Sequence, residues 1–212
     1  MEIIYFDEVD STQLYLIDKL KNNELLPPVA VVAKLQKNGI GSRNNRWIGE
    51  RGNLFLSFAI KKSDLALDLP LQSLSIYFAY ILKDILSKKG SKIWLKWPND
   101  FFIDDKKIGG VITSIIQDQI VICGVGLNIE SKVKNFSKLD IKVDLEELIK
   151  NFLFEVEKKL SWKKIFSKYK LEFQKGKNFT FHIDGKIFFL KDAKLLEDGS
   201  VEINNKKVYS LR

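Results

Sequence analysis

Residues 96–110 read KWPNDFFIDDKKIGG, and this stretch carries more constraints than a plain hairpin needs. After a tryptophan and a proline, an amide and a carboxylate stand side by side in Asn99 and Asp100. The run DDKK predicts a turn between two strands. Gly109 and Gly110 let the backbone approach a ligand, because no Cβ stands in the way. A hairpin alone requires only the turn, and we therefore predict that this segment is the active-site hairpin.

The segments around this hairpin have the pattern of an α+β domain. Apolar, β-branched runs predict strands at residues 2–9, 29–36, 52–60, 93–97, 107–117 and 120–129. Apolar residues at helical spacing predict helices at residues 13–22 and 70–90 and two more within 144–175. Consecutive strands joined by hairpins require a sheet that is substantially antiparallel or mixed. The predicted fold class is therefore α+β, with helices flanking a mixed sheet.

From residue 178 onward the apolar residues alternate with period two, which indicates short strands. The pairs Asp184-Gly185 and Asp198-Gly199 are strong hairpin-turn signals, and Asn204-Asn205 is a weaker one. Several short strands in this tail predict a small β-barrel. We therefore expect a catalytic domain at residues 1–175 and a barrel at residues 176–212.

Scarce residue types exclude several classes of enzyme. The chain has one histidine, His182, and one cysteine, Cys123, and neither lies in a glycine-rich or polar segment. Cys123 lies in the apolar run IVICGV, which predicts a buried, inert thiol. A Ser-His-Asp or Cys-His hydrolase and a His/Cys zinc site are therefore not expected. Catalysis must depend on lysines, arginines, carboxylates, amides and backbone donors.

The remaining composition indicates a protein of the cytoplasm. A single cysteine cannot form an intramolecular disulfide, which fits a reducing compartment. No apolar run approaches the roughly 18 to 20 residues of a membrane span. The N-terminus, MEIIYFDEVDST, lacks the basic flank of a signal peptide. We therefore expect a cytoplasmic protein with no membrane partner.

The net charge of +8 leaves two interpretations open. The lysines are spread along the whole chain, which is typical of a solvated basic surface. The alternative is an anionic partner, and ATP or an acidic carrier protein fits that description as well as nucleic acid does. A basic nucleic-acid-binding module therefore remains a second class of function. It predicts an affinity that falls steeply with salt.

Two further segments contribute polar and glycine residues to the predicted site. Residues 39–47 read GIGSRNNRW and predict a mobile loop that closes over a ligand. The end of a predicted strand reads GVGLN, residues 124–128. No GxGxxG fingerprint is completed, so a Rossmann site is not expected. Cations and glycine amides suit a phosphate, which indicates transfer at a phosphorus or acyl centre by positioning and charge neutralisation.

KWPND, then KIGG, then GVGLN resembles the biotin protein ligases. The match extends upstream to Ser11 and Thr12 and to a Q-x-x-G-x-G loop with a downstream tryptophan, and downstream to the terminal SLR. It therefore covers essentially the whole chain. The resemblance implies a class II synthetase-like catalytic domain with a mixed sheet, followed by a small SH3-like barrel.

The resemblance also implies a reaction in two steps. Biotin's carboxylate attacks the α-phosphate of ATP, with Mg²⁺ assisting, and gives biotinyl-5′-AMP and pyrophosphate. A lysine amine of a biotin carboxyl carrier protein, as in acetyl-CoA carboxylase, then attacks the activated carbonyl. The metal ligands are not identified by the resemblance.

The same resemblance assigns roles to individual residues. Lys107 and Arg43 take the catalytic positions, with Lys107 contacting the biotin carboxylate and the phosphate. A solvated turn lysine is the alternative interpretation, and Lys106 fits it better. The biotin side comprises Ser11, Thr12, Gln13, Gln36, Gly39, Ile40, Gly41, Ser42, Lys107 and Gly110. The nucleotide side comprises Arg43, Arg46, Trp47, Asn99, Asn128 and Arg212.

The loop departs from the family's common G-R-G-R-R-G-R pattern. Ile40 and Ser42 replace two of its arginines, Asn44 replaces its third glycine, and Asn45 replaces its last arginine. Arg43 remains in register and Arg46 is near, so phosphate contact is expected with altered nucleotide affinity or adenylate retention. A smaller change is Gln13, which stands where an asparagine is common.

Three expectations concern partners and relatives. Only ten residues precede Ser11, which leaves no room for the helix-turn-helix of bifunctional relatives, so we expect no DNA binding. An exposed sheet edge predicts a homodimer as one option for assembly. The nearest alternative activity is a lipoate or octanoate ligase or transferase of the same superfamily. Those relatives usually carry a histidine close to the glycine-rich stretch, whereas His182 lies in the predicted barrel.

Overall fold

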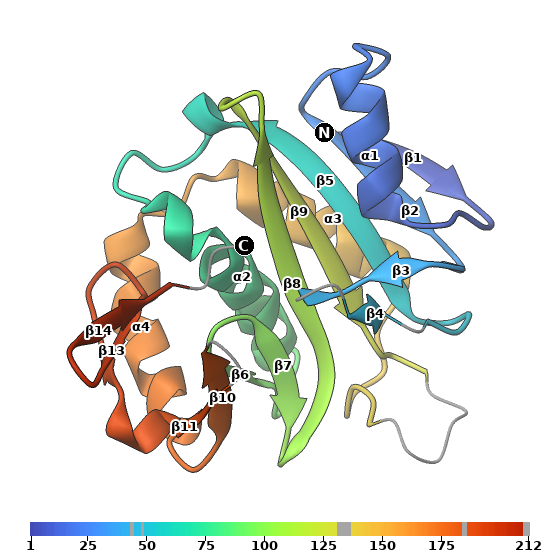
Figure 1. The fold of residues 1–212 in the computed structure, drawn as a ribbon. Coiled ribbons are helices and arrows are strands. Elements are labelled where there is room, and N and C mark those ends of the chain that lie inside the picture. Colours follow the sequence, from blue (N-terminus) through green and yellow to red (C-terminus); the bar gives the residue numbers. More distant parts are fainter. Residues whose placement is uncertain (43–44, 48, 131–136, 184–185, 210–212) are drawn as a thin grey trace.

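The computed structural model describes residues 1–42, 45–47, 49–130, 137–183 and 186–209. Its centre is a seven-stranded sheet in the order β1-β2-β5-β9-β8-β7-β6 (Figure 1). The strands are β1 (Glu2–Phe6), β2 (Val29–Ala33), β5 (Leu54–Lys61), β6 (Trp94–Lys96), β7 (Asp100–Ile103), β8 (Lys106–Ile116) and β9 (Ile120–Leu127). β1 and β2 run parallel, and every other neighbouring pair runs antiparallel. The prediction of a mixed sheet between helices is confirmed.

One helix, α1 (Thr12–Lys21), connects the parallel strands and covers one face of the sheet. Ser11 begins it, because its Oγ accepts a hydrogen bond from the backbone N–H of Leu14 at 3.4 Å. Leu16 and Leu20 lie on the inner side of the helix and are buried against the sheet strands. Capping therefore sets Ser11 and Thr12 at the buried start of α1, next to the sheet.

The opposite face is covered by α2 (Leu74–Lys88), α3 (Leu145–Glu157) and α4 (Trp162–Lys175), as Figure 1 shows. A 3₁₀ turn, Leu71–Ser73, leads into α2. α3 and α4 separate at Lys159, which has a positive φ of 50°, and Ser161 caps α4. The two predicted helices within 144–175 are therefore confirmed. No helix in the described ranges is long and apolar enough to cross a membrane.

Two strands end earlier than the sequence predicts. β1 stops at Phe6 and β2 at Ala33, whereas residues 9 and 36 were the expected ends. Charged side chains begin there, and Asp7 forms ion pairs with Lys34 and Arg51 in solvent. Only an isolated parallel bridge between Val9 and Gln36 continues the pairing. This bridge keeps the start of α1 and the chain after β2 close together.

Residues 39–47 are not simply the loop that the sequence predicts. β3 (Gly39–Ile40) and β4 (Arg46–Trp47) pair antiparallel as a two-stranded ribbon. Figure 1 shows this ribbon in front of the central strands, on the face that carries α1. Its tight pairing needs Gly39, because a Cβ there would lie 2.6 Å from the Trp47 carbonyl oxygen. The ribbon places the Trp47 side chain over the sheet.

The C-terminal region contains short strands, as predicted. β10 (Thr180–Ile183) pairs with β11 (Lys186–Phe189), and β12 (Lys194–Leu195), β13 (Val201–Ile203) and β14 (Lys206–Val208) form a three-stranded sheet. Two 3₁₀ turns, Lys62–Asp64 and Leu190–Asp192, complete the regular structure. Asn204 and Asn205 both have positive φ, as a tight hairpin turn requires. Closure into an SH3-like barrel and a boundary at residue 175 stay predictions.

The turn at residues 197–199 attaches this region to the rest of the protein. Three successive carbonyl groups accept side-chain hydrogen bonds: that of Glu197 from Trp162 Nε1, that of Asp198 from Ser73 Oγ and that of Gly199 from Trp97 Nε1. Gly199 has φ of 77°, and an added Cβ would lie 2.6 Å from Ser73 Oγ. The tryptophan of WPND is thus buried against the C-terminal region.

Asp198 makes this attachment sensitive to acid. Partial burial raises the pKa of its carboxyl, but hydrogen bonds from Lys207, Ser200 and Gln72 outweigh this effect and lower the pKa from 3.8 to about 2. The unfolded chain therefore takes up this proton at higher pH than the folded protein does. The stabilising contribution is complete above about pH 4 and is lost as the pH falls toward 2.

We therefore expect Asp198→Asn to flatten the dependence of unfolding free energy on pH between about 4 and 2. Urea unfolding at a series of pH values measures this dependence. Asp192→Asn is the matched control, because Asp192 is an exposed carboxylate in the same region. Parallel curves for wild type and Asp198→Asn would show that the hydrogen-bonded carboxylate does not matter for acid stability.

Candidate functional site

A cavity of about 340 Å³ opens on the sheet face that carries α1 and the β3–β4 ribbon. All predicted site residues that the structure describes line this cavity, except Gly39. Gly39 is buried inside the ribbon and acts there through its backbone. Arg43 and Arg212 lie outside the described residues, and so do Asn44 and the terminal SLR. Segments distant in sequence thus meet at one place, as the hairpin hypothesis requires.

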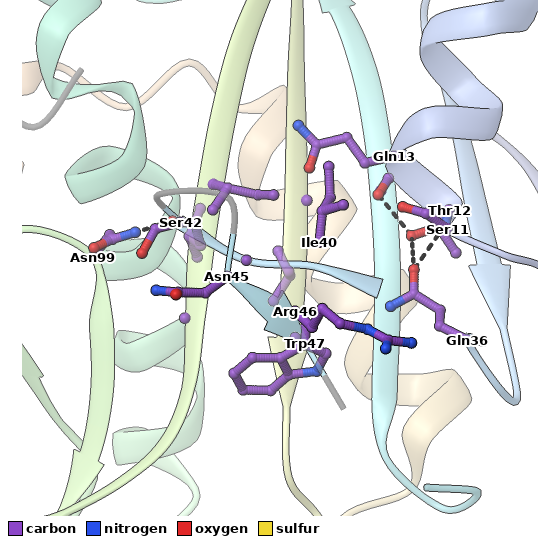
Figure 2. Close-up of a pocket in the computed structure, with 18 of the residues that line it drawn as sticks. Ser11, Thr12, Gln13, Gln36, Ile40, Ser42, Asn45, Arg46, Trp47 and Asn99 are labelled. Atoms are coloured by element: carbon purple, nitrogen blue, oxygen red, sulfur yellow. Dashed lines mark hydrogen bonds between the residues drawn. The ribbon is translucent and has the colours of Figure 1, made fainter. Parts of the chain in front are cut away.

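One corner of the cavity is a chain of hydroxyl and amide groups (Figure 2). Gln36 Oε1 accepts hydrogen bonds from Thr12 N at 2.8 Å and from Thr12 Oγ1 at 3.0 Å. Thr12 Oγ1 also lies 2.8 Å from Ser57 Oγ. The Thr12 proton points to Gln36, because that oxygen can only accept, and Ser57 must therefore donate to Thr12. With their protons committed, the Thr12 and Ser57 hydroxyls can accept from a ligand's N–H groups, and Gln36 Nε2 can donate to a C=O group.

Ser57 was missed by the sequence analysis. It is fully buried in the apolar strand β5, LFLSFAIK, and its neighbours Leu56 and Phe58 belong to the core. A lone serine within such a run was the available signal, because a buried hydroxyl needs a hydrogen-bond partner. Its place opposite Thr12 depends on tertiary contacts between α1 and β5.

Two buried polar atoms of the lining lack partners in the described part of the chain. Gln13 Oε1 makes no hydrogen bond there, and neither does Trp47 Nε1. Glycines make room for both side chains: a Cβ at Gly124 would lie 2.5 Å from Gln13 Oε1, and one at Gly126 would lie 2.7 Å from the Trp47 ring. A buried unpaired donor or acceptor costs about 1–3 kcal/mol. These atoms therefore favour a ligand that supplies the missing partners.

The hairpin of residues 96–110 forms another wall. β6, β7 and β8 pair in sequence, and Asp100 faces Gly110 across β7 and β8. The register shifts between Phe101 and Phe102, so that Phe102 faces Lys107 and Ile108 has no partner on β7. Without this bulge, Lys107 and Gly110 would point to opposite faces, because they are three residues apart. The bulge brings Lys107, Gly110 and Asp100 to the cavity together.

The cavity wall formed by the hairpin of residues 96–110 contains an ion pair. Lys107 Nζ lies 2.6 Å from Asp100 Oδ1, and their side chains are 42% and 18% exposed. Gly110 allows the close approach, because a Cβ there would lie 3.3 Å from Asp100 Oδ1. A half-exposed ammonium group beside a cavity can move to a ligand's carboxylate or phosphate. The sequence places Asp100 in the hairpin, and no individual role was predicted for it.

Three of the residues predicted for a nucleotide are held by hydrogen bonds. Asn99 Nδ2 donates to the Val111 carbonyl at 2.5 Å, and Val111 N donates to the Asn99 carbonyl at 2.9 Å. Asn128 Nδ2 donates to the Ser137 carbonyl at 3.3 Å. Arg46 is exposed at the rim and donates to Asn38 Oδ1 at 3.1 Å. Figure 2 shows Asn99 and Ser42 on the side of the cavity away from Thr12 and Gln36.

Further lining residues were not predicted as site members. They are the polar Asn45, the glycines of β9 and apolar side chains of β8 and β9: Val111, Ile112, Gly124, Val125 and Gly126. The motif GVGLN was a signal for the two glycines, because alternating glycines leave one strand face open. The apolar residues carried no such signal, since any buried strand has the same composition.

The two scarce residue types lie outside the site. Burial raises the pKa of the Cys123 thiol well above its usual value, so the thiolate is suppressed. His182 is on β10, and the residues that line the cavity do not include it. The expectation of an inert cysteine agrees with this burial. The charged side chains among the described residues that line the cavity are those of Arg46, Asp100 and Lys107.

The described ranges contain no group of three or more His, Cys, Asp or Glu that could hold a metal ion. Asp100 is the one carboxylate among the described residues that line the cavity. Mg²⁺ is usually held by one or two carboxylates together with substrate phosphates. This donor set fits a Mg²⁺ ion that arrives with a nucleotide, and it does not provide a protein cage.

Residues 5–128 match the model of the biotin/lipoate A/B protein ligase family. Among curated proteins, the chain is 33% identical over 129 residues to the bifunctional ligase/repressor BirA of Escherichia coli. That alignment covers 57% of this chain and 38% of BirA, so the chain spans well under two thirds of this relative. The chain is also 32% identical over 108 residues to biotin–protein ligase 2 of Arabidopsis thaliana.

Solved structures extend the similarity to the whole chain. The biotin acetyl coenzyme A carboxylase synthetase of Helicobacter pylori, solved with bound biotinylated ATP, is 44% identical with a TM-score of 0.93. The alignment covers 98% of this chain and 99% of that one. The Aquifex aeolicus biotin protein ligase with biotin and ATP has a TM-score of 0.76 at 22% identity, which shows the shared fold.

Proposed function

Because the chain belongs to the biotin/lipoate A/B protein ligase family, we propose that it activates biotin with ATP and transfers it to a protein lysine. The products of the first step are biotinyl-5′-AMP and pyrophosphate. The acceptor is a lysine of a biotin carboxyl carrier protein. Biotin is favoured over lipoate because the Helicobacter pylori structure, 44% identical over nearly the whole chain, carries biotinylated ATP.

One observation carries this proposal. The cavity combines a corner of oriented hydroxyl and amide groups with a cationic wall formed by Lys107. Biotin has the matching polarity, with a ureido head that carries N–H and C=O groups and a carboxylate at the other end. Ser11, Thr12 and Gln36 pair the head, and Gly110 lets the backbone approach the same head.

Lys107 acts on the charge that develops during the first step. As the biotin carboxylate attacks the α-phosphate of ATP, negative charge grows on the phosphoryl oxygens. Lys107 leaves Asp100 and moves to these oxygens, where an ammonium group stabilises the transition state. The cavity holds the two anionic reactants together, which removes much of the entropic cost of their encounter.

The nucleotide is held on the side of Trp47, Asn99 and Asn128. The Trp47 ring offers a stacking surface, and Arg46 at the rim offers a cation to phosphate. Phosphate contacts are also proposed for Arg43 and Arg212, and this proposal rests on their positions in the sequence. Asp100, the carboxylate of the described lining, would hold a Mg²⁺ ion bound together with the nucleotide, and such an ion would supply positive charge to the phosphates.

A direct assay tests this function. Purified protein is incubated with ATP, biotin and a biotin carboxyl carrier domain, and biotinylation is detected by mass spectrometry. Pyrophosphate release that depends on biotin, and a carrier lysine that gains one biotin, are the expected results. A parallel reaction with lipoate separates the related activity, and faster pyrophosphate release with lipoate would contradict the choice of substrate.

Gly126 offers a test of the nucleotide side. A Cβ at this position would lie 2.7 to 3.0 Å from three atoms of the Trp47 ring, and the ring must move. We expect Gly126→Ala to weaken binding of biotinyl-AMP by about tenfold, equivalent to about 1.4 kcal/mol. Isothermal titration calorimetry measures the change.

The double variant Trp47→Phe/Gly126→Ala is the control for this explanation. The three atoms that meet the added Cβ belong to the indole, and the smaller ring relieves the clash. Adding Gly126→Ala to Trp47→Phe should therefore cost less than about threefold in affinity, since contacting residues are not additive. Equal tenfold losses in both backgrounds would exclude the clash as the cause.

A further inference from the structure

A second cavity, of about 420 Å³, lies between α2, α3 and α4, the helices on the sheet face opposite the candidate functional site (Figure 1). The cavity of the candidate site measures about 340 Å³, and the two share no lining residue among those that the structure describes. Volumes of about 300 to 1,000 Å³ are typical of sites for small molecules. Nothing in the proposed function uses the second cavity, so its lining needs a separate explanation.

The floor of the second cavity is apolar. It is formed by buried side chains of α2 and α4, namely Tyr80, Ile81, Ile85 and Ile165. Burial raises the pKa of the Tyr80 hydroxyl to about 12, so this side chain carries no negative charge at neutral pH. Such a floor favours an apolar group that covers it and displaces water.

The rim of the second cavity is basic. Exposed lysines from all three helices line it, namely Lys88, Lys89, Lys158, Lys164 and Lys168. The lining also contains two carboxylates, and each pairs with a lysine of the same rim. Asp84 Oδ2 lies 2.8 Å from Lys88 Nζ, and Glu155 Oε1 lies 2.6 Å from Lys158 Nζ. Lys89 pairs with Glu147 at 2.7 Å, outside the lining.

Lys164 and Lys168 are the two lysines of this rim that lack a counter-ion. Neither ammonium group forms an ion pair with any residue in the described ranges. They are four residues apart on α4, so their side chains are neighbours on one face of the helix. Like charges at this spacing destabilise a helix, and an anion bound between them would remove this repulsion. The rim therefore favours an anionic group at Lys164 and Lys168.

We propose that the cavity between α2, α3 and α4 is a second binding site, which takes a small amphiphilic anion. The apolar chain of this ligand covers Ile81, Ile85 and Ile165. Its carboxylate or phosphate head group lies between Lys164 and Lys168. An apolar floor disfavours a fully ionic ligand, and a rim with two uncompensated cations disfavours a neutral or cationic one.

Decanoate is the test ligand, and isothermal titration calorimetry with the full chain measures its affinity below the concentration at which it forms micelles. We expect saturable binding. Decyl phosphate carries the same chain, and the tighter of the two ligands identifies the preferred head group. Decanol has the chain without the charge, and acetate has the charge without the chain. Each of these two should bind more weakly than decanoate by about tenfold or more, because each lacks one of the two interactions.

The double variant Lys164→Gln/Lys168→Gln tests the head-group position. It should weaken decanoate binding by about tenfold, as expected for the loss of two exposed charge contacts. Lys163→Gln/Lys170→Gln is the matched control, because it removes the same charge from the same helix and neither lysine lines the cavity. Its affinity should change by less than about twofold. Equal losses in the two double variants would indicate attraction to net charge alone and would overturn the proposal.

Asn151→Phe tests the location of the chain without a change of charge. Asn151 lines the cavity from α3 and is half-buried, so a larger ring at this position takes up space that the chain needs. Decanoate affinity should fall by about tenfold or more. Circular dichroism verifies that each variant is folded. Lys107→Ala should bind decanoate as the wild type does, because Lys107 belongs to the other cavity.

Three further results would overturn the proposal. The first is that the wild-type protein binds neither decanoate nor decyl phosphate. The second is unchanged binding in Asn151→Phe. The third is loss of binding in Lys107→Ala, which would place decanoate in the cavity of the candidate functional site. None of these results depends on biotin activation, so the proposed function is tested separately by its own assay.

Discussion

Lys107→Ala is expected to lower the rate of biotinyl-AMP formation by about 10³-fold, whereas biotin affinity should fall by less than about tenfold. The ammonium group interacts most strongly with charge that develops on phosphorus, so its loss affects the transition state more than the bound substrate. Pre-steady-state pyrophosphate release measures the first quantity, and calorimetry with biotin alone measures the second.

Asp100 complicates a simple alanine substitution. Without Lys107, its carboxylate is left unpaired next to the place where two anionic substrates meet. The double variant Lys107→Ala/Asp100→Asn removes this repulsion, and any rate it recovers over Lys107→Ala measures that repulsion. If the rate of the double variant stays about 10²-fold or more below wild type, this remaining loss is due to the missing cation.

Lys106→Ala is the matched control for Lys107→Ala. Lys106 is adjacent and exposed, and it does not line the cavity. Its removal should change neither quantity by more than about twofold, as for other surface substitutions. Equal losses of rate and affinity in Lys107→Ala would show that Lys107 acts only as a clamp for the bound substrate.

Lys83→Met is expected to lower the free energy of unfolding by about 3 kcal/mol, the low end of the range for a broken buried ion pair. Glu172 on α4 is buried, and its carboxylate accepts from Lys83 at 3.0 Å, from Lys175 at 2.9 Å and from the Leu95 backbone at 3.2 Å. Removing Lys83 leaves a buried charge that Lys175 only partly compensates. The pair joins α2, α4 and β6, the strand that leads into WPND.

Chemical denaturation followed by circular dichroism measures this effect, and the melting temperature should fall by roughly 10 °C. Lys175→Met is the control, because that side chain is 53% exposed and pairs with the same carboxylate. It should cost less than about 1 kcal/mol, as surface pairs do. The double variant Lys83→Met/Glu172→Leu should recover part of the loss, since it removes both buried charges. Similar losses for both lysine variants would contradict a special role for the buried pair.

Local pattern was sufficient for most elements of the fold. Apolar periodicity located α2 and the strands from β5 to β9, because burial on a helix face or a sheet face imposes a fixed spacing on apolar residues. Residues 39–47 show where the pattern was insufficient. Two-residue strands such as β3 and β4 leave no periodic signal, and their pairing is supported by the sheet beneath them.

The residues of the candidate site also divide into those that local sequence identified and those that only the tertiary structure revealed. Motifs and a family resemblance identified Thr12, Gln36, Lys107 and Asn128 as members, and the structure brings these four to one cavity. Ser57 was not assigned, and Asp100 was placed in the hairpin without a role. Ser57 stands in a strand of ordinary buried composition, and its importance follows from a contact with Thr12 on α1, 45 residues away. The place of Asp100 follows from its ion pair with Lys107 across β7 and β8.

The sequence by itself determined the α+β class, the family resemblance and the hairpin of residues 96–110, because spacing and residue type are local properties of the chain. Only the tertiary structure decided which side chains of that hairpin share the cavity. Strand alternation would place Lys107 and Gly110 on opposite faces, and the bulge opposite Phe101 and Phe102 brings them together. That shift depends on how β8 pairs with both β7 and β9, and pairing between strands is a property of the folded sheet.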